Sequence, residues 1–144
     1  MDLTMRAYPI ADPLRDSGQR LLLNRLGREL QDGLAYRREV PFPDPHDLRA
    51  WDGLIEPADR SWCVRVEAET RISDGQALAR KLARKMRDGG PGHLVLLVPD
   101  TRHNRAALRV IRDELRPLLP LDGRAILAAL REGRDPGGSG IVVL

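Results

Sequence analysis

Three carboxylates near the middle of the chain are spaced for metal-dependent chemistry. Glu67 and Glu69 lie two residues apart in the segment WCVRVEAET, which has the pattern of a strand. Alternate residues of a strand share one face, so these two side chains would lie about 6.6 Å apart along it. Asp52 belongs to the preceding expected strand, which a hairpin-like return brings alongside. Neighbouring carboxylates repel one another unless an arginine or a bound cation neutralises them, or one of them is protonated.

Such a cluster is suited to Mg²⁺ or Mn²⁺, which bind carboxylate, water and phosphate oxygens. The ion can activate water and stabilise the charge of a phosphodiester transition state. We therefore treat Asp52, Glu67 and Glu69 as candidate catalytic residues and metal ligands. The alternative is a solvated strand face, on which Glu67 and Glu69 form salt bridges with Arg65 or Arg71. The spacing alone leaves both interpretations open.

Apolar periodicity predicts the elements that would position these side chains. We expect helices at 17–31, 74–87, 101–116 and 123–131, and strands at 34–42, 46–56, 62–70, 93–99 and 141–144. Ser17 is the expected N-cap of the first helix. Ser73 is the expected N-cap of the second, because Gln76 three residues later completes a capping box. Asp100 or Thr101 would cap the third.

The order of these elements predicts an α/β fold with a mixed β-sheet flanked by helices. The three successive strands can form an antiparallel meander, whereas the later strand–helix–strand passages need crossovers and parallel pairing. The chain has 144 residues, which is enough for one domain with a sizeable core. We expect a single domain over 18–144, preceded by an N-terminal arm or linker over 1–17.

The order helix, three strands, helix, strand, helix resembles the common core of the PD-(D/E)XK nuclease superfamily, which has the restriction-endonuclease-like fold. In that family, an acid on the second strand and an acid-x-Lys motif on the third bind the metal and assist the attacking water. The resemblance covers about residues 18–116. It implies that Asp52 is the first acid, that Glu67 is the acid of the second motif, and that the backbone carbonyl of Ala68 is a further ligand.

The sequence departs from this family at the lysine, whose position is held by Glu69. Some family members carry a substitute lysine on the following helix, and the only lysines of this chain, Lys81 and Lys85, lie there. In helical projection they fall about 60° and 20° from Leu78, on the inner edge of the apolar stripe. One of them could reach the carboxylates. Alternatively, both stems line the core edge while their ammonium groups extend into water. Family variants without the lysine include inactive scaffolds, so the resemblance leaves catalysis open.

A second resemblance rests on the strings DLRAWDGLI, VEAETR, LVPDTRHNR and GRDPGGSG. They are similar to a module of actinobacterial proteins that often lies C-terminal to a helix-turn-helix DNA-binding domain of the Cro/repressor type. This resemblance begins at about Leu34 and implies a second hypothesis. The chain would then be a non-catalytic regulatory or partner-binding module associated with such a regulator, either as a fused domain or as a separate protein.

A third group of candidate residues follows the apolar strand 93–99. Arg102, His103 and Arg105 lie where this strand passes into a helix. Backbone N–H groups at a helix start attract anions, so these side chains would help to hold a phosphate of the DNA substrate. The alternative is ordinary capping by Asp100 or Thr101, with the arginines exposed.

Composition limits the remaining choices. The 24 lysines and arginines outnumber the 21 acids, and the formal charge of +3 permits nucleic-acid contact without requiring it. The single cysteine, Cys63, excludes an intramolecular disulfide and a cysteine-based zinc cage. We find no signal peptide and no membrane-spanning run, and we expect a cytoplasmic protein. The leading hypothesis is a nuclease-fold protein acting on DNA with Mg²⁺ or Mn²⁺. The sequence also leaves open that the chain is a small-molecule effector domain. It does not decide between a monomer and a homodimer.

Overall fold

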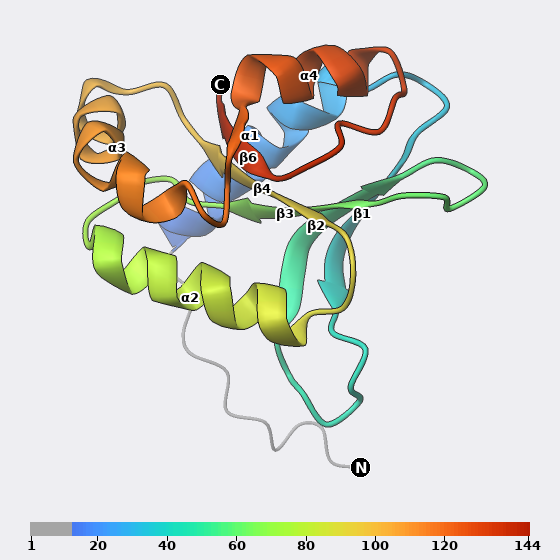
Figure 1. Cartoon of the computed structure of the whole chain (residues 1–144), viewed down its shortest axis with the longest axis horizontal. Coiled ribbons are helices and arrows are strands. Elements are labelled where there is room, and N and C mark those ends of the chain that lie inside the picture. Colours follow the sequence, from blue (N-terminus) through green and yellow to red (C-terminus); the bar gives the residue numbers. More distant parts are fainter. Residues whose placement is uncertain (1–12) are drawn as a thin grey trace.

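The structure, a computed structural model, describes residues 13–144, with side chains from Asp16 onward. Within this range it is an α/β fold with a six-stranded mixed sheet and four helices (Figure 1). The helices are α1 (Pro13–Glu29), α2 (Gly75–Asp88), α3 (Arg102–Leu115) and α4 (Gly123–Arg131). The strands are β1 (Ala35–Pro41), β2 (Ala50–Glu56), β3 (Val64–Ala68), β4 (His93–Val98), β5 (Leu121–Asp122) and β6 (Gly140–Val143). The expected α/β class and mixed sheet are confirmed.

The strand order in the sheet is β1-β2-β3-β4-β6-β5. The first three strands form the expected antiparallel meander. From β3 onward every pairing is parallel, because each connection crosses over through a helix or a long loop. In this parallel half, Glu67 of β3 is in register with Leu96 of β4, which is in register with Ile141 of β6. One row of residues therefore runs across the sheet from the candidate site to its far edge.

Two hydrophobic cores cover the two faces of the sheet. On one face, α1 and α4 pack on alternate residues of the central strands, including Val66, Val95 and Val142. On the other face, α2 and α3 pack on the intervening residues, including Leu94 and Leu96. In Figure 1 the sheet accordingly runs between α2 on one side and α1 with α4 on the other. Because both faces are covered, β3 and β4 are almost entirely buried.

Several predicted element boundaries are wrong. Helix α1 begins at Pro13, so Ser17 lies inside it and is not its N-cap. The expected arm therefore ends before Pro13, and its residues 1–12 lie outside the described residues. The N-cap of α2 is Asp74 rather than Ser73, since the Asp74 carboxylate accepts from the N–H of Ala77 at 3.0 Å. Thr101 caps α3 as predicted.

The second strand is shorter than predicted, and β5 was not predicted. Strand β2 begins at Ala50 rather than His46, because Asp44 closes a turn by accepting from the backbone N–H of His46 at 2.9 Å. Strand β5 has only two residues and a pattern too short to recognise. Among residues 13–144, no helix combines the length and the apolar character needed to cross a membrane.

Candidate functional site

The candidate site lies where β2 and β3 separate. Their register runs from Ile55 opposite Val64 to Gly53 opposite Val66, and the regular pairing ends there. Beyond that point a side chain takes the place of a backbone hydrogen-bond acceptor from β2: Oδ2 of Asp52 accepts from the N–H of Ala68 at 2.8 Å.

The two ends of β2 pack in opposite cores. Ile55 packs in the core of α1 and α4, whereas Trp51 packs in the core of α2 and α3. Strand alternation alone would place both residues on the same face. Asp52, next to Trp51, lies beside Glu67, whose Oε1 is 3.4 Å from the Asp52 backbone nitrogen. The first two predicted acids therefore do meet in the fold.

Glu67 is buried and paired with lysine. It is 3% exposed, which excludes the solvated face considered from its spacing. Its Oε1 lies 2.6 Å from the Nζ of Lys85, and its Oε2 lies 3.6 Å from the Nζ of Lys81. Both helix lysines thus converge on one carboxylate of β3. This contact replaces the salt bridges to Arg65 or Arg71 that the sequence left open.

Opposing effects act on the charge of Glu67. Burial raises its pKa, and the neighbouring Asp52 carboxylate raises it further, while Lys85 and then Lys81 lower it. The net direction is upward, so the carboxylate is more easily protonated than an ordinary glutamate. Raised carboxyl pKa values beside a second acid are a common property of functional sites, although structural ion pairs produce them too.

Helix α2 holds Lys85 in place through its buried stripe. Leu78, Leu82 and Lys85 are its buried residues, at positions i, i+4 and i+7. Besides Glu67, the Lys85 ammonium donates to the carbonyl of Ala50 at 2.7 Å. It also lies 5.0 Å from the ring centre of Trp51. Lys85 is therefore fixed between β2, β3 and an aromatic face, and it is not free to extend into solvent.

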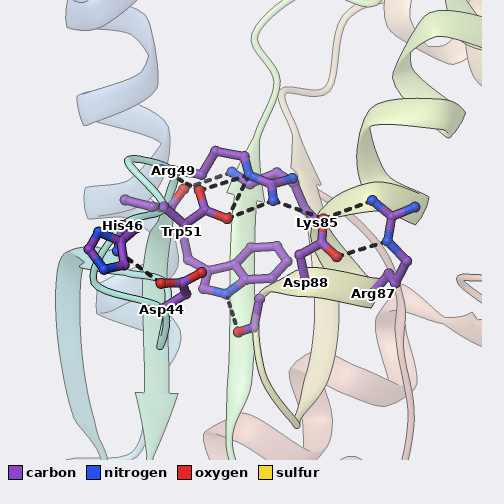
Figure 2. A network of polar contacts seen from close by, with 10 residues as sticks. Asp44, His46, Arg49, Trp51, Lys85, Arg87 and Asp88 are labelled. Atoms are coloured by element: carbon purple, nitrogen blue, oxygen red, sulfur yellow. Dashed lines mark hydrogen bonds and ion pairs between the residues drawn. The ribbon is translucent and has the colours of Figure 1, made fainter.

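A second polar network, drawn in Figure 2, ties the end of α2 to the segment before β2. Arg49 contacts Asp47 at 2.7 Å and Asp88, the last residue of α2, at 2.8 Å. Hydrogen bonds from Arg87 and then from Arg49 hold the pKa of Asp88 well below its usual range. The Trp51 indole N–H donates to the carbonyl of Gly89 at 3.0 Å. This network fixes the last turn of α2, and with it the position of Lys85.

Lys81 forms the exposed side of the site. Its side chain is 45% exposed, and its Nζ lies 3.8 Å from Oε2 of Glu69 as well as close to Glu67. A hollow of about 200 Å³ opens beside it and is lined by Glu69, Asp74 and the start of α2. Of the two lysines, Lys81 is therefore the one that an incoming molecule could contact. Glu69, the third predicted acid, contributes to the wall of this hollow.

Sequence reasoning missed Gln19, which also belongs to the site. Its Nε2 donates to the Ala68 carbonyl at 3.1 Å, the oxygen that the family resemblance implies as a main-chain metal ligand. A signal was present: Gln19 continues the buried α1 stripe of Leu22, Leu23 and Leu26 at helical spacing. A polar residue in such a stripe needs a buried hydrogen-bond partner.

The donor set fits partial coordination of a divalent cation. Among residues 16–144, no group of three His, Cys, Asp or Glu side chains is arranged to hold a metal ion. Asp52 and Glu67 do supply two adjacent carboxylates, and Mg²⁺ often uses one or two carboxylates together with water and substrate phosphate oxygens. The Ala68 carbonyl is engaged by Gln19. Asp52 and Glu67 are therefore the side chains that would hold an ion.

The three residues predicted to bind phosphate lie at the start of α3, where two of them have partners within the protein. His103 bonds the carbonyl of Ile72 through Nε2 at 2.7 Å, which fastens α3 to the segment after β3. Arg105 forms a salt bridge with Asp100, and this contact holds the pKa of Asp100 below its usual range. Arg102 is exposed at the start of α3. Thr101 caps α3 and Arg102 is exposed, as the capping alternative describes, and the phosphate-binding role of this segment stays a prediction.

Comparison with known proteins finds no relative on which to test the site. The chain matches no protein-family model, no curated protein and no solved structure.

Proposed function

We propose that this chain is a nuclease of the PD-(D/E)XK type that acts on DNA with Mg²⁺ or Mn²⁺. The observation that carries the proposal is the meeting of Asp52 and Glu67 at the separation of β2 and β3, with Lys81 and Lys85 directed at Glu67 from α2. The element order supports it, since a helix, an antiparallel meander, a second helix and a parallel fourth strand occur in sequence. A pair of acids on adjoining strands with a nearby lysine is the arrangement that the resemblance implies.

The residues of the site have different proposed roles, which follow from how exposed each side chain is. Asp52 and Glu67 would hold the ion, which supplies an activated water and stabilises charge on the phosphodiester. Lys85 is buried, lowers the pKa of Glu67 and orients its carboxylate, so we assign it a positioning role. Lys81 faces the hollow and can contact a phosphate oxygen or the attacking water. The two lysines together thus replace the single lysine missing from the strand motif.

The test is cleavage of plasmid and single-stranded DNA in Mg²⁺ or Mn²⁺. We expect the wild type to cleave, and Asp52→Asn and Glu67→Gln to lose about 100-fold or more of the rate, because each removes an ion ligand. Glu132→Gln is the matched control, since Glu132 is exposed at the end of α4 and pairs only with Arg134 among residues 16–144. Cleavage that persists in Asp52→Asn, or no cleavage by the wild type with either ion, would contradict the proposal.

A second candidate is a non-catalytic module of a helix-turn-helix regulator. The observation that favours it is that Lys85 and Lys81 already contact both oxygens of Glu67, so the buried charge is neutralised without a metal. On this hypothesis, calorimetric titration with Mn²⁺ gives no binding, and Glu67→Gln leaves partner binding intact. Mn²⁺ binding that Asp52→Asn abolishes would favour the nuclease.

A further inference from the structure

A cleft of about 710 Å³ lies between α3 and α4, at the sheet edge formed by β6 and β5. Arg105 and Arg112 line it from α3, Arg116 lines it from the C-cap of that helix, and Arg124 lines it from the first turn of α4. Asp122 is the one acid among its described lining residues, and its carboxylate accepts from the backbone N–H of Arg124 at 3.0 Å. The walls therefore carry a clear excess of positive charge.

The floor of the cleft is apolar. Ile141 and Val143 of β6 form part of it, together with Leu119 and Leu127. Cationic walls over an apolar floor suit a ligand that has both anionic groups and an uncharged body. A nucleotide unit has this character, because its phosphate can meet guanidinium groups while the sugar and base cover aliphatic side chains.

Four arginines of α3 and its C-cap form a continuous stripe. Arg105, Arg109, Arg112 and Arg116 are spaced at i, i+4, i+7 and i+11. At 100° per residue they fall within about 60° of one another, and they extend over about 16 Å of helix. Like charges at this spacing repel one another and destabilise a helix. A stripe of this kind is characteristic of helices that follow a phosphate backbone.

Acids within the protein neutralise this stripe only in part. Asp100 pairs with Arg105 at one end of the stripe. Asp113 lies 3.4 Å from Arg116 at the other end, but its side chain is 93% exposed, so water screens the pair. Within residues 16–144, no carboxylate forms a salt bridge with Arg112 or with Arg124 on the opposite wall. These two guanidinium groups line the cleft without an acidic partner from the described chain.

We propose that the cleft binds the phosphodiester backbone of a single nucleic-acid strand. Its volume lies in the range of about 300–1,000 Å³ typical of pockets that enclose one small ligand, so it admits a short stretch of one strand and excludes a duplex. The length of the stripe favours a strand over a compact nucleotide, which could engage only part of it.

This inference goes beyond the proposed nuclease, because the two sites are separate. Ile141 in the cleft floor lies in the same row of the sheet as Glu67, but two strands away, or about 10 Å. The fully buried Leu96 lies between them. The cleft shares no lining residue with the carboxylate site. Binding in the cleft and cleavage at the carboxylates can therefore be tested, and can fail, independently.

The experiment is fluorescence anisotropy with a short labelled single-stranded oligonucleotide of mixed sequence, in EDTA so that no cleavage occurs. We expect the double variant Arg112→Gln/Arg124→Gln to weaken binding by about tenfold or more. The slope of log K against log salt should fall by about 1.4, since each lost phosphate contact on a single strand contributes about 0.7. The control is Arg60→Gln/Arg134→Gln, which removes the same charge from exposed arginines outside the cleft.

The outcomes separate the hypotheses. Weaker binding in the cleft variant but not in the control supports the proposal, provided that circular dichroism shows both variants folded. Equal effects of the two variants would show that net charge alone acts, and would overturn it. Tighter binding of a duplex of the same sequence, or full displacement of the strand by a free nucleoside triphosphate at equal phosphate concentration, would overturn it too.

Discussion

Replacing Lys85 by methionine tests the buried ion pair most directly. The substitution keeps the length of the side chain and removes the ammonium group 2.6 Å from Glu67 Oε1. Glu67, whose side chain is 4% exposed, would then carry a buried charge with only the more distant Lys81 beside it. Loss of one partner of a buried pair typically costs about 3–5 kcal/mol of unfolding free energy.

Protonation sets an upper limit on that cost. Glu67 in the variant can take up a proton, and at pH 7 this costs about 3.7 kcal/mol for a carboxyl of ordinary pKa near 4.3. The hydrogen bond from Lys85 to the Ala50 carbonyl adds about 1 kcal/mol. We therefore expect a loss of about 3–5 kcal/mol at pH 7. That is a large part of the total stability of about 5–15 kcal/mol of a typical domain.

The pH dependence of this loss has a definite sign. The pKa of Glu67 is already raised in the folded protein, and removing Lys85 raises it further. A carboxyl with a raised folded pKa favours the folded state fully below its unfolded pKa and loses that contribution as pH rises through the folded value. The deficit of Lys85→Met relative to the wild type should therefore be smallest near pH 4 and grow toward pH 7.

Urea unfolding followed by circular dichroism, repeated across this pH range, measures the deficit. Lys81→Met is the matched control, because Lys81 lies on the same helix, contacts the same carboxylate and is 45% exposed. It should cost less than about 1 kcal/mol. In a Glu67→Gln background, the stability cost of Lys85→Met should be nearly independent of pH, because the titrating carboxyl is gone. A Lys85→Met deficit that is the same at pH 4 and pH 7, or no larger than that of Lys81→Met, would refute the reasoning.

Two further predictions concern the positioning of α1 and α4. Burial raises the pKa of Tyr36 to about 12, and its hydroxyl donates to the Leu23 carbonyl at 2.9 Å. Tyr36→Phe should therefore cost about 1 kcal/mol of stability. It should leave the ultraviolet phenolate signal at about pH 10 unchanged, because Tyr36 is not ionised at that pH. A signal that decreases there would show that the phenol ionises normally. Gly123→Ala would place a methyl group 2.1 Å from the Ile141 carbonyl oxygen. We therefore expect thermal unfolding to show a loss of about 1–3 kcal/mol of unfolding free energy. Unchanged stability would contradict this close approach of the two backbones.

Local patterns predicted most of the elements, because periodicity and turn residues act over a few positions. Helical spacing placed Lys85 beside the Leu78 and Leu82 stripe, and the structure buries all three. Alternation along β3 placed Glu67 on the face opposite Val64 and Val66, which is where it lies. In both cases the geometry of a single element was enough.

What could not be predicted depends on contacts between distant segments. The end of pairing between β2 and β3, which places Asp52 on the N–H of Ala68, has no signature in either strand alone. The same holds for Gln19, which reaches Ala68 from a helix 49 positions away in sequence. The choice of Asp74 over Ser73 as N-cap was a local competition between two good capping residues, which the capping-box pattern decided wrongly.

The shortness of β5 has a consequence for the solubility of the protein. In the part of the chain that the structure describes, β5 pairs with β6 only at Gly140 and Ile141, so the outer edge of the apolar strand continues beyond it toward Val143. An uncovered apolar edge can template pairing with another copy and lead to aggregation. The arginines along this edge, Arg112 among them, would bring like charges together in any such pairing. We therefore expect these arginines to oppose edge-to-edge pairing between copies of the chain.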